Sequence, residues 1–133
     1  MGRIRVLIAD DHQDLRRAVH EFLDRIPNVS VVGEASDGKE VVEEVAKLHP
    51  DVVLMDIAMP FQSGLTATRI IKQRWPEIKV FIATMHDYPV YRKQAQEAKA
   101  DGFLLKSSLK PSLEAAFGSV ARREERVSAV QAK

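Results

Sequence analysis

Five side chains suited to phosphate chemistry stand at or just after the ends of short apolar runs in this sequence: Asp10, Asp11, Asp56, Thr84 and Lys106. Three carboxylates in one crevice would repel one another, and a hard divalent cation would relieve that repulsion. Mg²⁺ is the candidate, because it accepts one or two carboxylates together with water and phosphate oxygens. The lysine could pair with one phosphoryl oxygen, and the threonine hydroxyl could donate a hydrogen bond to another. If these side chains meet, they predict phosphoryl transfer onto Asp56, with its carboxylate as the nucleophile.

The elements that would position these side chains are five short apolar runs separated by amphipathic stretches. The runs are rich in β-branched residues and lack polar alternation, which is typical of parallel strands covered on both faces. They are Ile4–Ala9, Val29–Glu34, Val52–Met55, Val80–Thr84 and Gly102–Leu105. The amphipathic stretches predict helices at residues 12–25, 38–48, 64–74, 88–99 and 110 to the mid-120s. Five such strand–helix units predict an α/β domain, a doubly wound five-stranded parallel sheet with five helices.

A parallel sheet gathers the carboxyl ends of its strands along one edge. In open sheets of this kind, ligands bind beyond that edge, at the point where the strand order reverses. Asp10 and Asp11 follow the first run, Asp56 follows the third, Thr84 ends the fourth and Lys106 follows the fifth. We therefore expect all five side chains to lie along the same edge.

The bulk composition excludes several other classes of protein. The chain has 20 basic and 19 acidic residues, and this balance argues against nucleic acid or an anionic membrane as the main partner. It has no cysteine, which excludes disulfides, zinc–thiolate sites and cysteine nucleophiles. No apolar run approaches the roughly 20 residues of a membrane span, and the first residues lack the pattern of a signal peptide. We expect a cytoplasmic protein without membrane contact.

Each of these side chains, taken alone, also has an ordinary structural explanation. The two adjacent acids could cap the helix that follows, because acids are favoured at helix starts. Thr84 alone could be a plain strand residue, and Lys106 alone could be a solvated lysine. His12 and His86 could line the rim of the crevice, and we expect no metal or catalytic role for them. The phosphoryl-transfer hypothesis therefore depends on the five residues occurring together.

Six segments of the chain resemble a known family. In order they are IADDH (8–12), VVGEASDGKE (31–40), PDVVLMDIAMP (50–60), SGLTATRII (63–71), IATMHD (82–87) and ADGFLLK (100–106). Together they resemble the receiver domains of two-component response regulators. The likeness is greatest to the subgroup with a LuxR-type helix-turn-helix, which includes the nitrate-response and nitrogen-fixation regulators. It extends from about Ile4 to about Val120, which is nearly the whole chain.

The resemblance implies a phosphorylation switch. Asp56 would accept a phosphoryl group from a sensor histidine kinase. The domain would not be an enzyme beyond the chemistry of its own phosphorylation and dephosphorylation. Asp11 and Asp56 would bind Mg²⁺ directly, together with the main-chain carbonyl of Ala58, whereas Asp10 would act through a water molecule.

The resemblance also implies how the signal is read and how the chain is divided. Thr84 and the aromatic Phe103 would be the switch residues, and homodimer formation is one way to transmit their change. The strand order would be flavodoxin-like, 2-1-3-4-5. Residues 1–122 would form the receiver, and residues 123–133 would be a helix end or tail. Regulators of this subgroup carry an output domain that reads DNA, so the chain is either a receiver that acts by itself or a piece of a longer regulator that controls transcription. The chain alone is not expected to bind DNA.

Two positions depart from the family pattern. Relatives often have glycine where this chain has Lys99, at a left-handed position after a helix. A lysine in that conformation costs roughly 1–2 kcal/mol, so we expect a rebuilt or looser turn. Many receivers also have proline after the lysine, whereas Ser107 follows Lys106 here. Without proline a cis peptide would cost about 2.5–4 kcal/mol, so we expect a trans bond.

Three other classes of protein share part of this pattern. A haloacid-dehalogenase-like phosphatase also uses a strand-end aspartate and Mg²⁺, but it needs a second acid two residues later, where this chain has Ala58. A nucleotide-binding α/β domain would carry GxGxxG or GxxxxGK(S/T) after a strand, and the sequence has neither motif. A pseudo-receiver that only mediates contacts would lack one of the acids, the threonine or the lysine. All of these are present.

Overall fold

The computed structural model describes residues 3–117, and these form an alternating series of strands and helices. The strands are β1 (Ile4–Ala9), β2 (Val29–Ala35), β3 (Val52–Asp56), β4 (Lys79–Thr84) and β5 (Gly102–Leu105). The helices are α1 (Gln13–Asp24), α2 (Gly38–Leu48), α3 (Gly64–Arg74) and α4 (Pro89–Glu97). A 3₁₀ turn, Lys106–Ser108, then leads into a helix over residues 109–117. The five predicted strands are confirmed, and so are the four predicted helices between them.

The expectations for the last part of the chain lie outside the described residues. The fifth helix was predicted to continue into the mid-120s, and it is described only as far as residue 117. The proposed boundary after residue 122 and the tail at 123–133 lie beyond that point. Among the described residues, no helix is long and apolar enough to cross a membrane.

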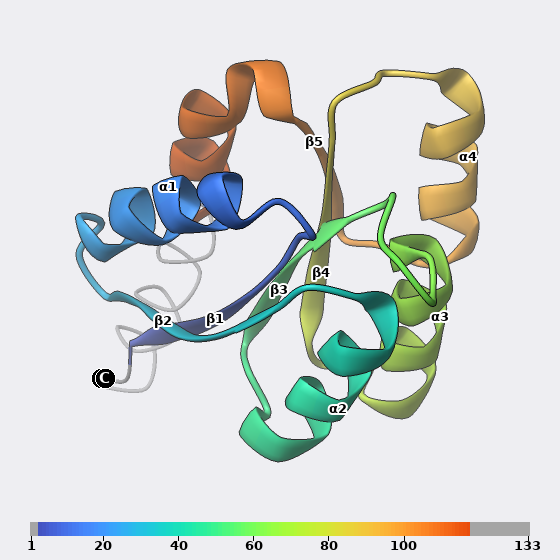
Figure 1. Ribbon diagram of the computed structural model, residues 1–133, viewed down its shortest axis with the longest axis horizontal. Helices are drawn as coiled ribbons and strands as arrows, with labels where there is room; N and C mark the ends of the chain where they lie inside the picture. Colours follow the sequence, from blue (N-terminus) through green and yellow to red (C-terminus); the bar gives the residue numbers. More distant parts are fainter. Residues whose placement is uncertain (1–2, 118–133) are drawn as a thin grey trace, which may run out of the picture.

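The five strands form one parallel sheet in the order β2-β1-β3-β4-β5, as predicted (Figure 1). In β1, Ala9 pairs with Ala35 of β2 on one side and with Met55 of β3 on the other. The chain therefore reverses its direction of travel across the sheet between β1 and β3. A crevice at the carboxyl ends of these two strands is the expected ligand position in such a sheet. This fold places the ends of β1 and β3 side by side.

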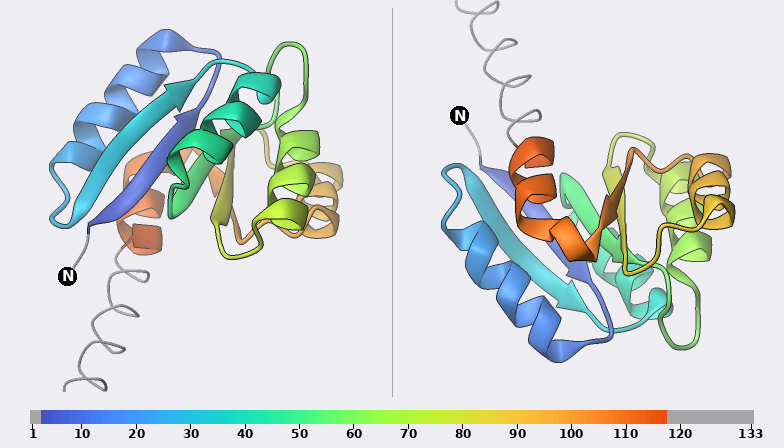
Figure 2. Two further views of the ribbon diagram at one scale, coloured as in Figure 1. Left: turned by 90° about the horizontal axis from the view of Figure 1, so that it is seen from below. Right: turned by 90° about the horizontal axis from the view of Figure 1, so that it is seen from above.

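Helices cover both faces of the sheet (Figures 1 and 2). On one face α2, α3 and α4 pack over the apolar side chains of the sheet, through residues that include Val41, Val45, Leu65, Ile71 and Ala95. On the other face α1 and the helix over 109–117 do the same, through residues that include Val19, Leu23, Leu113 and Phe117. Burial on both faces explains why the strands are continuous apolar runs instead of alternating patterns. It also leaves the strand ends as the place where polar side chains gather.

The turn after α4 keeps the geometry that a glycine usually supplies, so the expectation of a rebuilt turn is wrong. Lys99 has a φ of 67°. Its N–H donates to the carbonyl oxygen of Gln96 at 3.0 Å, and the N–H of Ala100 donates to that of Ala95, also at 3.0 Å. These two bonds form a Schellman motif, with Lys99 at its left-handed position. The hydrogen bonds hold the lysine there despite a local cost of roughly 1–2 kcal/mol.

The peptide bond between Lys106 and Ser107 is trans, as expected, because residues 3–117 contain no cis peptide bond. The chain enters the 3₁₀ turn directly at Lys106, the residue after β5. The lysine is thus held between the end of the last strand and the start of the final helical segment. Both β5 and the 3₁₀ turn therefore determine where Lys106 lies.

Candidate functional site

Three carboxylates gather at the carboxyl edge of the sheet. Asp56 is the last residue of β3, and Asp10 follows the last residue of β1. Oxygens of Asp10, Asp11 and Asp56 and a ring nitrogen of His12 all lie within 4.8 Å of one another. Asp10 and Asp56 are buried, with 5% and 6% of their surface exposed, whereas Asp11 is exposed. The strand order thus brings together acids that are 45 residues apart, and the pocket is compatible with a divalent metal ion.

A single lysine joins the two buried acids. The Lys106 Nζ lies 2.7 Å from Asp10 Oδ2 and 3.1 Å from Asp56 Oδ1. Its side chain is only 4% exposed. One buried cation therefore faces two buried carboxylates, with the carboxylate of Asp11 beside them. The pocket has an excess of negative charge that the lysine does not neutralise.

This arrangement perturbs the carboxyl group of Asp56. Burial raises the pKa of the Asp56 carboxyl above its ordinary value and is the largest of the effects on it. The Lys106 ammonium lowers this pKa, whereas the negative charges of Asp10 and Asp11 raise it. A buried carboxyl group with a raised pKa and a specific charged partner is typical of a functional site.

Thr84 lies at the same edge of the sheet, at the end of β4. The register pairs Asp56 with Ala83, so Thr84 is one residue farther along the neighbouring strand. Its side chain is buried, and its Oγ1 accepts a hydrogen bond from the main-chain N–H of His86 at 3.3 Å. Because a hydroxyl that accepts one bond still has its own proton to donate, Thr84 can offer a hydrogen bond to another group.

The loop after Asp56 returns to the end of β3, where its main chain packs against that of Asp56. The main-chain N–H of Gly64 donates to the carbonyl oxygen of Ile57 at 2.9 Å. A Cβ on Gly64 would lie 1.8 Å from the carbonyl oxygen of Asp56, so a glycine is required for this approach. Ala58 is exposed at the mouth of the loop, and Phe61 is 92% exposed with a φ of 66°. The start of this loop is therefore held close to the end of β3, whereas residues farther along the loop are exposed.

Phe103 lies away from the acids. It is half-buried in β5 against the apolar cluster shared with α4, and the Arg92 guanidinium of α4 lies 4.6 Å from its ring centroid. Arg92 and Phe103 also line a pocket of about 350 Å³ between α4 and β5. Phe103 is thus in contact with a helix at the surface, with free volume beside it.

Two residues near the acids make contacts that the sequence did not predict. The ring Nδ1 of His12 lies 3.2 Å from Asp10 Oδ1 and 3.0 Å from Asp11 Oδ1, although this side chain is 69% exposed. Arg16 Nη1 donates to the main-chain oxygen of Asp10 at 2.6 Å. His12 was expected at the rim, and its position directly after the acids was the signal. For Arg16 the only signal was its place one helical turn after His12.

The alternative reading of the paired acids as helix caps does not describe the structure. The N-cap of α1 is His12, and no side chain caps this helix end. The Asp10 carboxylate instead accepts a hydrogen bond from the His12 N–H at 2.9 Å, and its other oxygen pairs with Lys106. Asp10 therefore belongs to the charge cluster and not to the helix end.

An α/β fold with strand order 2-1-3-4-5, with acids and a lysine at its carboxyl edge, defines a receiver domain of the two-component kind. Residues 6–117 match the family model described as the response regulator receiver domain. The chain belongs to this family.

Similar proteins support the LuxR-type subgroup. The chain is 42% identical over 105 residues to the transcriptional regulatory protein DegU of Brevibacillus brevis, a match that covers 79% of this chain and 44% of DegU. It is 36% identical over 123 residues to the response regulator protein VraR of Staphylococcus aureus, covering 91% of this chain and 58% of VraR. The crystal structure of a LuxR-family two-component response regulator from Aurantimonas sp. SI85-9A1 superposes with a TM-score of 0.84 at 33% identity. That match covers 90% of this chain and 85% of the other. The chain thus spans about half the length of the curated relatives it matches.

Proposed function

We propose that this chain is a phosphoacceptor switch that receives a phosphoryl group on Asp56 from a phosphohistidine of a sensor kinase. The observation that carries the proposal is the charge arrangement around Asp56, a buried carboxylate with a raised pKa in contact with Lys106 and beside two further acids. Such a carboxylate combines a nucleophilic oxygen with a fixed cation for the incoming phosphoryl group. Domain membership alone would not single out this aspartate.

The donor set fits Mg²⁺. Carboxylate oxygens dominate the cluster of groups within 4.8 Å of one another, and hard oxygen donors are what this ion prefers. The excess of negative charge over the single lysine gives the ion a reason to bind. Asp11, Asp56 and the main-chain carbonyl of Ala58 would hold it directly, and Asp10 would act through water. When bound, the ion supplies positive charge beside the phosphoryl oxygens.

The reaction exchanges one bond to phosphorus for another. A carboxylate oxygen of Asp56 attacks the phosphorus, a P–O bond forms, and the P–N bond to the donor imidazole breaks with its electron pair leaving on the nitrogen. Lys106 pairs with one phosphoryl oxygen, and the Thr84 hydroxyl donates a hydrogen bond to another. Hydrolysis reverses the state, because water attacks the phosphorus and releases inorganic phosphate and the Asp56 carboxylate. The residues act by position and charge.

The readout would begin at Thr84. Its hydroxyl now accepts a hydrogen bond from the His86 N–H, and turning toward the phosphoryl group would break that bond and free the loop before α4. Phe103 can then rotate toward the vacated space, away from the Arg92 guanidinium. Phosphorylation thereby biases a pre-existing two-state equilibrium. The surface formed by α4, β5 and the following helix would report it to a partner or to a second copy of the chain.

In a full-length regulator this change would control an output domain that acts on transcription. The length of the curated relatives supports such a plan, because this chain spans only about half of DegU and VraR. The chain alone has balanced charge and is proposed not to bind DNA itself. Cytoplasmic residence and a kinase partner complete the proposal.

Intact mass spectrometry after incubation with acetyl phosphate and Mg²⁺ tests the proposal. The mass should rise by one phosphoryl group, and Asp56→Asn should show no rise. Chelation of Mg²⁺ should abolish the labelling of the unchanged chain. Asp14→Asn is the matched control, because Asp14 is an exposed aspartate at the start of α1, and this variant should be labelled like the unchanged chain. Equal labelling of Asp56→Asn would reject the acceptor assignment.

Beryllofluoride, a phosphoryl mimic, tests the readout. Its addition with Mg²⁺ should move the amide resonances of residues 10–11 and 56–58 and also those of residues 88–105. Phe103→Leu should retain the first set of changes and lose much of the second, because the smaller side chain uncouples β5 from α4. Changes confined to the acid pocket in the unchanged chain would reject the coupling.

A further inference from the structure

The main chain between the two acids is held by a side chain from α1. Arg16 Nη1 donates to the main-chain oxygen of Asp10 at 2.6 Å. On the other side of the same residue, the Asp10 N–H donates to Ala35 O of β2 at 3.0 Å. Regular strand pairing ends there, because β1 ends at Ala9. The guanidinium therefore fixes the peptide plane that joins Asp10 to Asp11.

A second contact orients the guanidinium. Arg16 Nε donates to Glu34 Oε1 of β2 at 2.9 Å, and the arginine side chain is 16% exposed. The other oxygen of Glu34 lies 3.0 Å from His20 Nδ1, and His20 Nε2 is 3.4 Å from Asp24 Oδ2. Two different N–H groups of the planar fork are thus directed at two different acceptors. A lysine would offer a single ammonium group and could not reproduce the fixed directions of these two N–H groups.

We propose that Arg16, oriented by Glu34, is a positioning residue that aims the Asp11 carboxylate into the acid pocket for metal binding. The inference rests on the proposed function, because it assigns these residues to the Mg²⁺ site described above. Asp11 is more exposed than the two acids that Lys106 joins, with 32% of its side chain exposed. Its contact at 3.0 Å is a ring nitrogen of the exposed residue His12. Its direction therefore depends on its main chain. If the peptide between Asp10 and Asp11 were free to rotate, metal binding would also have to order it, and this cost would lower the affinity for the metal.

Arg16 could either position Asp11 or simply attach α1 to the sheet, and its contacts distinguish these two roles. A fastening would need only the Arg16–Glu34 ion pair, which already joins α1 to β2. The additional bond ends on the one carbonyl that lies between two acids of the pocket. Outer contacts that orient metal-binding groups commonly change metal affinity by 10- to 100-fold when they are removed. The same magnitude is expected here.

Mg²⁺ titration of the purified chain, followed through the amide resonances of residues 10–11 and 56–58, tests the proposal. Arg16→Gln should weaken Mg²⁺ binding by about tenfold or more. Arg16→Lys should weaken it nearly as much, although the charge is kept. Glu34→Gln should give a smaller loss, and adding it to Arg16→Gln should give no further loss, because the two residues act through one another. Arg17→Gln is the control, since Arg17 is the exposed neighbour on the same helix.

The readout distinguishes positioning from stability. Urea denaturation of each variant is measured beside the titration, and Glu34→Gln serves if Arg16→Gln fails to fold. A loss of stability with unchanged Mg²⁺ affinity in the Arg16 or Glu34 variants overturns the proposal, and so does full affinity in Arg16→Lys. If the unchanged chain shows no Mg²⁺-dependent shifts at these residues, the proposed metal site itself is rejected and this inference falls with it. Tenfold weaker binding in both Arg16 variants, with Arg17→Gln unchanged, supports it.

Discussion

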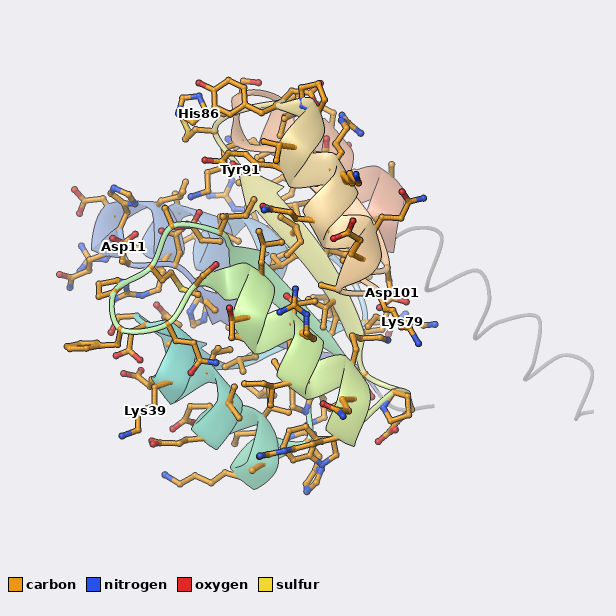
Figure 3. All side chains as sticks on the ribbon, turned by 90° about the vertical axis from the view of Figure 1, so that its right-hand side faces the viewer. Asp11, Lys39, Lys79, His86, Tyr91 and Asp101 are labelled. Carbon is orange, nitrogen blue, oxygen red and sulfur yellow. The ribbon has the colours of Figure 1, made fainter. Side chains whose placement is uncertain are left out.

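The two ends of the sheet each carry a lysine in contact with aspartate, and they differ in how the charge is balanced. At the amino ends of β4 and β5, Lys72 Nζ lies 3.0 Å from Asp101 Oδ2 and also donates to the carbonyl oxygens of Pro76 and Ile78, both at 2.9 Å. At the carboxyl ends, Lys106 is shared between Asp10 and Asp56. Figure 3 shows Asp101 near Lys79 at one end and Asp11 at the other.

The difference lies in the use of donors and acceptors. The three N–H groups of Lys72 have three protein acceptors, and the same oxygen of Asp101 also accepts from the Val80 N–H at 2.8 Å. This pair is complete and holds the end of α3 to the start of β4 and the turn before β5. The Lys106 cluster has more carboxylates than cations, so it can still bind a cation and a phosphoryl group. A balanced pair stabilises a fold, whereas an unbalanced one can take part in chemistry.

The largest effect on stability is expected at the balanced end. Lys72→Met removes one of the partners of Asp101 and the ammonium donor to two carbonyl oxygens, and the free energy of unfolding should fall by about 2 kcal/mol. Phosphorylation of the folded variant by acetyl phosphate should continue. Urea denaturation and intact mass measure the two outcomes.

Lys79→Met is the control for that variant. Its Nζ is 3.9 Å from Asp101 Oδ1 and its side chain is 42% exposed, so its loss should cost less than about 0.5 kcal/mol. Equal losses for the two lysines would show that the hydrogen bonds of Lys72 add nothing beyond surface charge. If folded Lys72→Met were no longer phosphorylated by acetyl phosphate, the claim that one end of the sheet serves stability and the other serves chemistry would be wrong.

A smaller effect of opposite sign is expected at the unbalanced end. The pKa of Asp56 is raised in the folded chain above its ordinary value of 3.8, so the unfolded chain releases this proton at a lower pH. Between the two pKa values the folded chain binds more protons, and stability falls as the pH rises. Above the folded pKa the penalty is complete. Without metal, Asp56→Asn should therefore raise the free energy of unfolding at pH about 8 by about 1 kcal/mol.

The pH dependence of that gain is the check. The difference between Asp56→Asn and the unchanged chain, measured by urea denaturation in the presence of a chelator, should shrink as the pH falls toward 3.8. Asp14→Asn, at an exposed position, should show no such trend. A destabilised Asp56→Asn at pH about 8 would show that the acid is not under electrostatic strain.

The sequence was sufficient to predict the strands and the gathering of the acids. Both follow from local patterns, because apolar runs mark buried parallel strands and all their carboxyl ends share one edge. Placing Asp10 and Asp56 at that edge required no knowledge of side-chain packing.

Local sequence patterns could not predict which side chains pair with one another across the fold. That Lys106 contacts Asp10 more closely than Asp56, or that Arg16 reaches the Asp10 carbonyl, depends on how helices settle on the sheet. Lys72–Asp101 joins residues 29 positions apart and has no motif. At Lys99 a local rule gave a wrong prediction. A rebuilt turn was expected, but the two hydrogen bonds of the turn hold Lys99 in the left-handed conformation. The conformational preference of a single residue was outweighed by the hydrogen bonds of the helix end.

The most direct test of the account is to locate the phosphoryl group on the chain. Borohydride reduces an acyl phosphate, so the phosphorylated aspartate becomes homoserine, and peptide mass spectrometry identifies its position. After treatment with acetyl phosphate and Mg²⁺, the account predicts homoserine at residue 56 alone. Homoserine at residue 10 or 11, or at residue 101 in the balanced pair, would contradict the claim that the excess of carboxylates around Lys106 makes Asp56 the acceptor.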